Sequence, residues 1–156
     1  MKNFKLADTV AGWAAFVVAT VSYLLTIEPT ASFWDCGEFI CTAFRQEVGH
    51  PPGAPLFMIM GRVFSLLAGG DVTLVAAMIN AMSALASGFT VLFLYWSIVH
   101  IARRIVIGDS KKDDGISTFQ GISIIGSGLV GSLAFAYTDT FWFSAVEGEV
   151  YAMSSL

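Results

Sequence analysis

Two carboxylates lie three residues apart in segment 34–38, which reads Trp-Asp-Cys-Gly-Glu. On a helix, side chains at this spacing project to the same side, so Asp35 and Glu38 would form a pair. Where such a pair is only partly solvated, one carboxyl pKa rises toward the range of a general base. The alternative is a solvated first helical turn, where acidic groups are favoured by the helix dipole.

A second motif, at 49–55, reads Gly-His-Pro-Pro-Gly-Ala-Pro and predicts a stiff, shaped loop. Its histidine, His50, could bind a phosphate or a carboxylate, or take part in proton transfer. The alternative is a loop that only starts the next helix and leaves His50 exposed.

A third motif, at 147–151, reads Glu-Gly-Glu-Val-Tyr and follows Asp139 and an aromatic stretch. Acidic groups in this setting could bind a cation or the hydroxyl groups of a sugar. The alternative is that they cap a helix at the membrane interface.

Other patterns point away from further chemistry. Gly126, Gly128 and Gly131 match the G-x-G-x-x-G pattern of dinucleotide sites, but small residues in an apolar run favour close packing of membrane helices instead. Cys36 and Cys41 form no C-x-x-C pair and, with only two histidines, no zinc signature, so we interpret both as packing residues. The net charge of −4 argues against a nucleic-acid partner, which requires a basic face.

The composition places these motifs in a membrane protein. The chain is 56% hydrophobic and 13% charged, against about 45–50% and about 25% in an average soluble domain. Three stretches, 9–27, 72–102 and 116–138, contain no Asp, Glu, Lys or Arg, and as helices they can cross a bilayer core of about 30 Å. The alternative for the first is a cleaved signal peptide, whose apolar region is shorter and ends in a small-x-small site. We predict an all-α membrane protein with about three transmembrane helices.

The basic residues predict the orientation of these helices. Six of the eight Lys and Arg residues are Lys2, Lys5, Arg103, Arg104, Lys111 and Lys112. The positive-inside rule places them together on the cytoplasmic side if the chain has three spans and loop 103–115 is cytoplasmic, but not if 51–70 is a fourth span. Residues 28–71 and those after about 138 then lie outside, with eight acidic residues against two basic ones. There, apolar residues at helical spacing predict an amphipathic juxtamembrane helix over 35–48.

Together, the motifs and their order among the spans resemble the N-terminal part of the GT-C membrane glycosyltransferases, which include protein O-mannosyltransferases and aminoarabinose transferases. O-mannosyltransferases carry an Asp-Glu pair and a His-Pro-Pro motif in their first outer loop. In closer detail, segments 33–39, 49–57 and 145–151 look like a large, mostly bacterial family of uncharacterised membrane proteins with animal members implicated in protein O-mannosylation. Since GT-C cores have many more spans, residues 1–156 are expected to be the N-terminal part of one GT-C-like domain.

The resemblance implies an inverting glycosyltransferase that moves a sugar from a polyprenyl-phosphate donor to a hydroxyl of an acceptor protein or glycan, with protein Ser or Thr as one expected acceptor. Asp35 is the expected base, with Glu38 as its partner or as a ligand of the acceptor. The expected substrate-binding residues are His50, Pro51, Pro52, Arg45, Arg62, Glu147, Glu149 and Tyr151. The bacterial look of the family suggests the inner membrane, with a cytoplasmic N-terminus and a periplasmic site.

Two departures from the O-mannosyltransferases bear on this mechanism. Two residues separate Asp35 from Glu38, whereas the Asp and Glu of those enzymes are adjacent. Those enzymes also hold the leaving phosphate with an arginine beyond the third span, where this chain has acids. The clamp must then come from Arg45, from Arg62, from a part of the protein outside this chain, or from a divalent metal held by the acids.

Two other classes of function remain open at this point: a transporter or lipid-handling protein with an acidic outer vestibule, and a structural subunit of a membrane complex. Transport predicts ionisable residues within the spans. The three charge-free stretches count against it.

Overall fold

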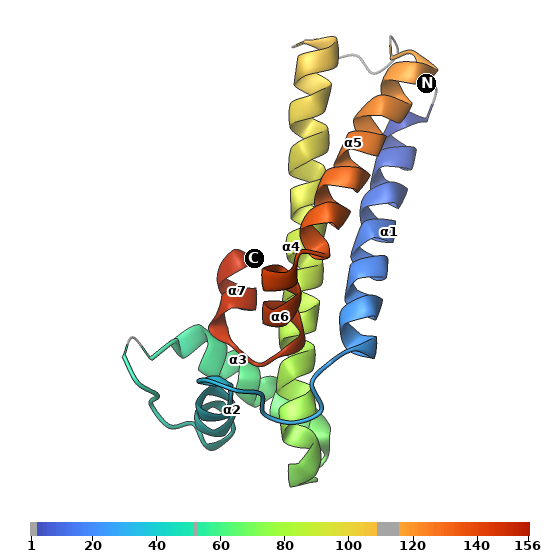
Figure 1. Ribbon diagram of the computed structural model, residues 1–156. Coiled ribbons are helices and arrows are strands. Elements are labelled where there is room, and N and C mark those ends of the chain that lie inside the picture. Colours follow the sequence, from blue (N-terminus) through green and yellow to red (C-terminus); the bar gives the residue numbers. More distant parts are fainter. Residues whose placement is uncertain (1–2, 52, 109–115) are drawn as a thin grey trace. The chain divides into compact units, whose positions relative to one another are not determined.

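The computed structural model describes residues 3–51, 53–108 and 116–156 of the chain (Figure 1). Within these residues the only regular elements are helices. They are α1 (Phe4–Leu25), α2 (Cys36–Arg45), α3 (Pro55–Ser65), η1 (Leu66–Ala68), η2 (Val72–Leu74), α4 (Val75–Ile107), α5 (Thr118–Ala136), α6 (Asp139–Val146) and α7 (Val150–Ser155). Three segments, Phe4–Leu25, Val72–Ile107 and Thr118–Ala136, are long and apolar enough to cross a membrane. The predicted all-α membrane class and the predicted number of spans are confirmed.

The chain divides into two units. Unit 1 comprises residues 1–19 and 88–138, and unit 2 comprises residues 20–87 and 139–156. Both arginines and all eight acidic residues that the positive-inside rule places outside belong to unit 2. The prediction that residues 1–156 form part of one GT-C-like domain stays a prediction.

The membrane helices extend past the charge-free stretches. Helix α1 begins at Phe4 and therefore includes Lys5 and Asp8. Helix α4 continues to Ile107 and includes Arg103 and Arg104. The charge-free stretches therefore form only part of these helices, because helical hydrogen bonding continues where the apolar sequence stops.

In unit 1, three helices meet around the wholly buried Tyr95 of α4. A Cβ atom at Gly12 of α1 would lie 3.0 Å from the Tyr95 ring, and one at Gly128 of α5 would lie 2.8 Å from it. A Cβ at Gly131 would lie 2.7 Å from Ile98, whereas one at Gly126 would meet nothing within 4 Å. The interpretation as helix packing is thus confirmed for two of the three glycines of the G-x-G-x-x-G pattern.

Helix α5 begins at a capping box. The Ser117 hydroxyl accepts a hydrogen bond from the Gln120 backbone N–H at 3.2 Å, and the Gln120 side-chain oxygen accepts one from the Ser117 backbone N–H at 3.0 Å. The reciprocal bonds satisfy two donors that a helix start leaves without partners. They explain why the helix begins at Thr118.

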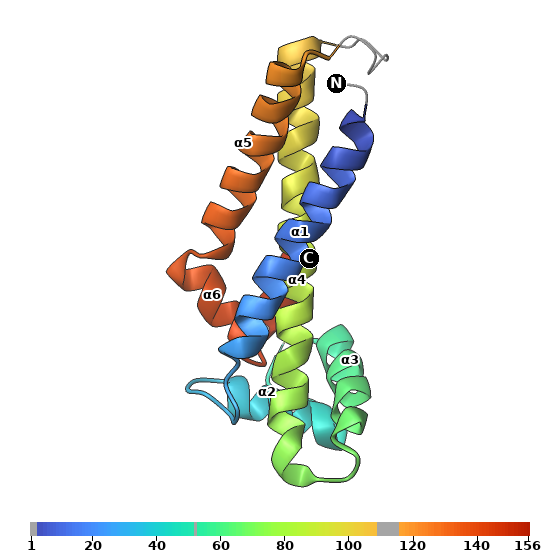
Figure 2. The same cartoon turned by 90° about the vertical axis from the view of Figure 1, so that its right-hand side faces the viewer.

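Unit 2 packs α2 and α3 against the first turns of α4, as both ribbon views show (Figures 1 and 2). The apolar face predicted for α2 is buried in this core. The core residues are Cys36, Phe39, Ile40, Ala43, Phe57, Met58, Ala68, Val75, Ile79 and Met82. A Cβ at Gly61 of α3 would lie 2.9 Å from the Ala43 Cβ, so this glycine permits close contact of α2 with α3.

Helix α2 is shorter than the predicted 35–48. It ends at Arg45 because Gln46 takes a left-handed conformation with φ of 58° and its side chain donates to the carbonyls of Ala43 and Met58 at 3.0 and 3.1 Å. Cys36 is buried as predicted, but Cys41 is exposed, so the interpretation of Cys41 as a packing residue is wrong.

The ambiguous segment 51–70 holds the short apolar helix Pro55–Ala68, formed by α3 and η1. Its length falls below that of the three candidate spans. The finding agrees with a three-span chain, while the side of the membrane on which this helix lies stays a prediction.

Candidate functional site

Asp35 occupies the N-cap position of α2, where its carbonyl accepts the backbone N–H of Phe39 at 2.9 Å. Its side chain makes no capping hydrogen bond. One carboxylate oxygen instead lies 3.9 Å from Nε2 of His50. The residue before it, Trp34, has a φ of 63°, a conformation that costs energy for a bulky side chain and often occurs at functional sites.

Glu38 binds His50 with both of its carboxylate oxygens. Oε1 accepts the His50 backbone N–H at 2.7 Å, and Oε2 lies 3.1 Å from the ring Nδ1. These bonds, the backbone one above all, hold the pKa of Glu38 below its usual range. The ring of His50 also contacts Phe39, with centroids 5.7 Å apart. The predicted carboxylate pair therefore lies on two sides of one histidine.

Asp35, Glu38 and His50 together offer three ligand atoms within 4.8 Å of one another. Two carboxylates and an imidazole are donors that suit zinc or manganese. Because Glu38 already accepts hydrogen bonds from His50 through both oxygens, a metal ion would have to replace the bond from the imidazole. The donor set therefore fits a metal ion only after the histidine ring changes its partner.

The third motif lies between α6 and α7 in the same unit. The Ser32 hydroxyl donates to Glu147. Glu149 precedes α7 as its N-cap and is only 7% exposed. Burial raises the pKa of Glu149, and the negative charges of Glu147 and Asp35 raise it further.

Asn80 of α4 connects these segments, a role that none of the three sequence motifs reveals. It is wholly buried, and its Nδ2 donates to the carbonyls of Glu28 and Thr30 at 2.7 and 3.1 Å. A Cβ at Gly148 would lie 2.8 Å from Asn80 Oδ1, so Gly148 allows the third motif to approach α4. The available signal was an amide side chain within the apolar run 72–102.

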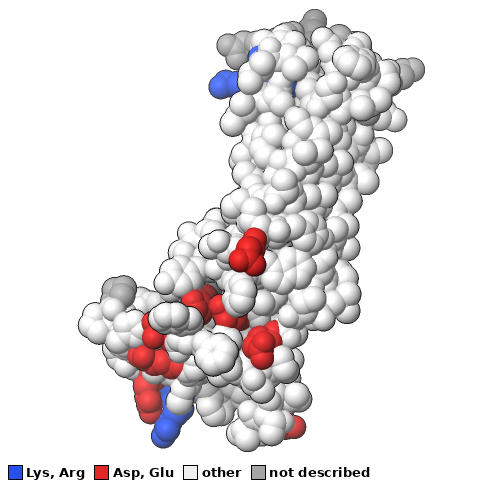
Figure 3. Space-filling model, viewed as in Figure 1, with Lys and Arg blue, Asp and Glu red and all other residues white. Residues whose placement is uncertain are grey.

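A cavity of about 780 Å³ opens between the segments of unit 2. Residues from both parts of the chain line it: Ser32, Phe33, Trp34, Asp35, Phe39, His50, Asp139, Thr140, Phe143, Ser144, Glu147, Glu149, Val150 and Tyr151. Figure 3 shows several acidic groups gathered on the viewed surface. The volume lies within the range of small-molecule sites, and the lining combines carboxylates with aromatic rings, which suits a polyhydroxy ligand.

The structure brings together only part of the predicted site. Five of the predicted residues line the cavity: Asp35, His50, Glu147, Glu149 and Tyr151. Glu38 does not line it but binds His50, which does.

The remaining predicted residues do not line the cavity. Pro51 is exposed outside it, and Pro52 lies outside the described residues. Arg45 forms an exposed ion pair of 3.1 Å with Glu47. Arg62 donates to the carbonyl of Phe44 at 2.9 Å, and its guanidinium lies 5.3 Å from the Phe44 ring centroid. Arg62 thus stabilises the C-terminal end of α2, and no Lys or Arg of the described residues lines the cavity.

These features define an all-α membrane protein with an acidic, aromatic cavity. Residues 35–156 match the model of the family described as Protein O-mannosyl-transferase TMEM260 N-terminal domain, and the chain therefore belongs to this family. It is 26% identical over 141 residues to the protein O-mannosyl-transferase tmem260 of Dictyostelium discoideum. The match covers 90% of this chain and 15% of that relative, so the chain spans a small part of the relative's length. No solved structure matches the chain.

Proposed function

We propose that the protein is a glycosyltransferase that moves mannose from a polyprenyl-phosphate carrier to a Ser or Thr hydroxyl of an acceptor protein. The family match and the name of the Dictyostelium discoideum relative support the transfer of mannose to protein. The observation that carries the proposal is the cavity lined by Asp35, His50, Glu147 and Glu149, which come from segments about one hundred residues apart.

In this proposal Asp35 is the general base. His50 occupies both carboxylate oxygens of Glu38 and lowers its pKa, whereas Asp35 lines the cavity. Asp35 takes the proton of the acceptor hydroxyl, whose oxygen attacks the anomeric carbon of the sugar. The bond between that carbon and the phosphate oxygen breaks, the lipid phosphate leaves with the electron pair, and the configuration inverts.

The second motif and the third motif bind the substrates. Glu147 and Tyr151 hold sugar hydroxyls, and His50 meets the acceptor or the phosphate. Glu149 is the second candidate for the base, since its raised pKa brings it toward the working range of such a group.

The leaving phosphate needs positive charge that the described cavity does not supply. Arg45 and Arg62 bind elsewhere in unit 2, so the charge comes from outside this chain or from a divalent cation on Asp35, Glu38 and His50. With Asp35 as a ligand of such a cation, Glu149 would be the base. Such a cation would neutralise the departing phosphate.

The test uses the full protein in membranes and measures transfer of labelled mannose from polyprenyl-phosphate mannose to an acceptor protein. Asp35→Asn should lower the rate by about 10²–10⁴-fold, the contribution of a general base. Glu47→Gln is the matched control, because Glu47 is an exposed acid of unit 2 that does not line the cavity. Full activity in both Asp35→Asn and Glu149→Gln would refute the proposal, and an unchanged rate in EDTA would remove the metal from it.

We further propose that unit 2 faces the non-cytoplasmic side and that the N-terminus is cytoplasmic. Cys41 offers a direct test because it is exposed, whereas Cys36 is buried. A membrane-impermeant maleimide applied from outside should label Cys41, and Cys41→Ser should remove that label. Labelling of Cys41 only after the membrane is opened would reverse the orientation.

A further inference from the structure

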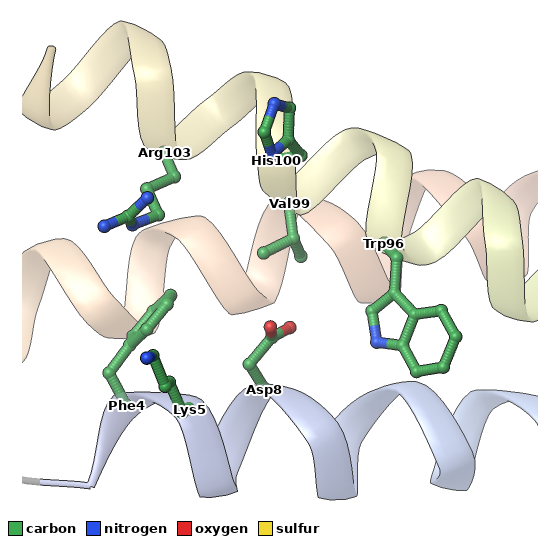
Figure 4. Close-up of a pocket in the computed structure, with 7 residues that line it drawn as sticks. All are labelled: Phe4, Lys5, Asp8, Trp96, Val99, His100 and Arg103. Carbon is green, nitrogen blue, oxygen red and sulfur yellow. The ribbon is translucent and has the colours of Figure 1, made fainter. Parts of the chain in front are cut away.

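A second polar cavity, of about 450 Å³, lies in unit 1 between the first turns of α1 and the last turns of α4 (Figure 4). Its seven lining residues are Phe4, Lys5, Asp8, Trp96, Val99, His100 and Arg103. None of them lines the acidic cavity of unit 2. Basic pockets between the ends of membrane helices are known binding places for lipid headgroups.

The cavity presents charges of both signs. Figure 4 shows the Asp8 carboxylate pointing from α1 toward α4, while Arg103 and Trp96 reach from α4 toward α1. Lys5 and Arg103 supply two cations, the residue types that bind phosphate by charged hydrogen bonds. A ligand that carries both a phosphate and an N–H donor would meet the two cations and the carboxylate together.

One atom in this cavity calls for a hydrogen-bond donor. Asp8 Oδ1 is buried and accepts no hydrogen bond among the described residues, although the Tyr95 hydroxyl interacts with the same carboxylate. A buried carboxylate oxygen without a donor is costly, so a ligand that brings an N–H group gains affinity here. The Trp96 ring beside it can also attract a cation.

An apolar groove shares two residues with the polar cavity. It has a volume of about 510 Å³ and is lined by Phe93, Trp96, Ser97, His100 and Ile101 along α4. Trp96 and His100 belong to both hollows, and Phe93 and Ile101 are exposed apolar side chains. A polar pocket next to an apolar groove matches a molecule with a charged head and a hydrocarbon chain.

We propose that unit 1 binds one glycerophospholipid with a primary-amine headgroup, such as phosphatidylethanolamine. Its phosphate pairs with Lys5 and Arg103, its ammonium donates to Asp8, and an acyl chain lies in the groove of Phe93 and Ile101. Phosphatidylcholine carries no N–H on its quaternary nitrogen and cannot satisfy the carboxylate. Phosphatidylglycerol brings the phosphate without an ammonium group for Asp8 Oδ1.

The test titrates the purified full protein with phosphatidylethanolamine, phosphatidylcholine and phosphatidylglycerol of identical acyl chains and reads bound lipid by native mass spectrometry. Phosphatidylethanolamine should bind about tenfold tighter than either other lipid, the size expected for one charged hydrogen bond. Equal affinity for all three would overturn the proposal. Free phosphoethanolamine should not displace the lipid at equal concentration, and displacement would overturn the acyl-groove part.

Two variants separate the roles of the charges. Asp8→Asn should abolish the preference for phosphatidylethanolamine over phosphatidylcholine, and because this is a ratio within one sample it does not depend on how much variant folds. Arg103→Ala should weaken all three lipids by about tenfold. Arg104→Ala is the matched control because Arg104 neighbours Arg103 but does not line the cavity. An unchanged preference in Asp8→Asn, or an equal loss in Arg104→Ala, would refute the assignment.

Discussion

Replacement of Asn80 by alanine should loosen the acidic cavity without touching any residue that lines it. Asn80 donates to the carbonyls of Glu28 and Thr30, the segment that leads to Asp35. The same segment is joined to the third motif, because the Glu28 N–H donates to the Val146 carbonyl at 3.1 Å. Loss of the amide therefore frees segment 28–30, which connects both to Asp35 and to the third motif of the cavity lining.

The expected cost follows from the two hydrogen bonds. Each contributes about 0.5–1.5 kcal/mol net to stability, and the wholly buried site leaves a small void when the amide is removed. We therefore expect Asn80→Ala to lower the free energy of unfolding by about 2–3 kcal/mol. Asn80→Asp keeps the shape but loses both donors, and it should cost at least as much.

Ser83→Ala is the matched control for this experiment. Ser83 is on the same helix and is also wholly buried, but its hydroxyl has no hydrogen-bond partner among the described residues. Thermal unfolding of the detergent-solubilised protein, followed by tryptophan fluorescence, should place Asn80→Ala well below the parent and Ser83→Ala close to it. Equal midpoints for Asn80→Ala and Ser83→Ala would refute the role given to the amide.

Three further results are expected. Hydrogen bonds from His50 lower the pKa of Glu38, so this contact stabilises the protein above the usual carboxyl pKa of 4.5 and the stabilisation is lost at lower pH. Glu38→Gln should therefore weaken the fall in melting temperature on acidification. Identical plots of melting temperature against pH for the variant and the parent would contradict this prediction. Burial raises the pKa of Glu149, so the protein loses stability as pH rises and the buried carboxyl becomes charged. Glu149→Gln should therefore melt at a higher temperature than the parent at about pH 8 and at the same temperature at about pH 4. Equal melting temperatures at both pH values would contradict the raised pKa. A Cβ at Gly128 would lie 2.5 Å from Val99, whereas one at Gly126 would meet nothing within 4 Å. Gly128→Ala should therefore lower the free energy of unfolding by about 1–3 kcal/mol, and Gly126→Ala should not lower it. Equal melting temperatures for the two variants would refute close packing at Gly128.

Local pattern in the sequence predicted what depends on neighbours along the chain. The spacing of Cys36, Phe39, Ile40 and Ala43 predicted the buried face of α2, and charge-free length predicted the three spans. Both signals report burial over one or two helical turns or over one membrane thickness. The end of α2 was predicted less accurately, because the helix stops at Gln46, a non-glycine residue in a left-handed conformation.

Long-range partners could not be read from the sequence. Residue type alone suggested Arg62 as a phosphate ligand, but the fold brings the Phe44 carbonyl to it and occupies the guanidinium. Asn80 shows the reverse case, since its partners lie about fifty residues earlier in the chain. In both cases the outcome depends on which backbone groups tertiary packing leaves without partners.

The spacing of Asp35 and Glu38 gives these two carboxylates different surroundings. Neighbouring residues on a helix point in directions about 100° apart, whereas residues three apart lie on one side. Here that side faces His50, so Glu38 binds its backbone and Nδ1 while Asp35 lies near Nε2. A carboxylate whose oxygens are both bound to a loop residue holds that loop in position. A carboxylate that borders a cavity can exchange protons with a ligand. In the proposed reaction Glu38 therefore holds the histidine loop and Asp35 carries out the chemistry. Glu38→Gln should then raise KM more than it lowers kcat, and Asp35→Asn should do the opposite.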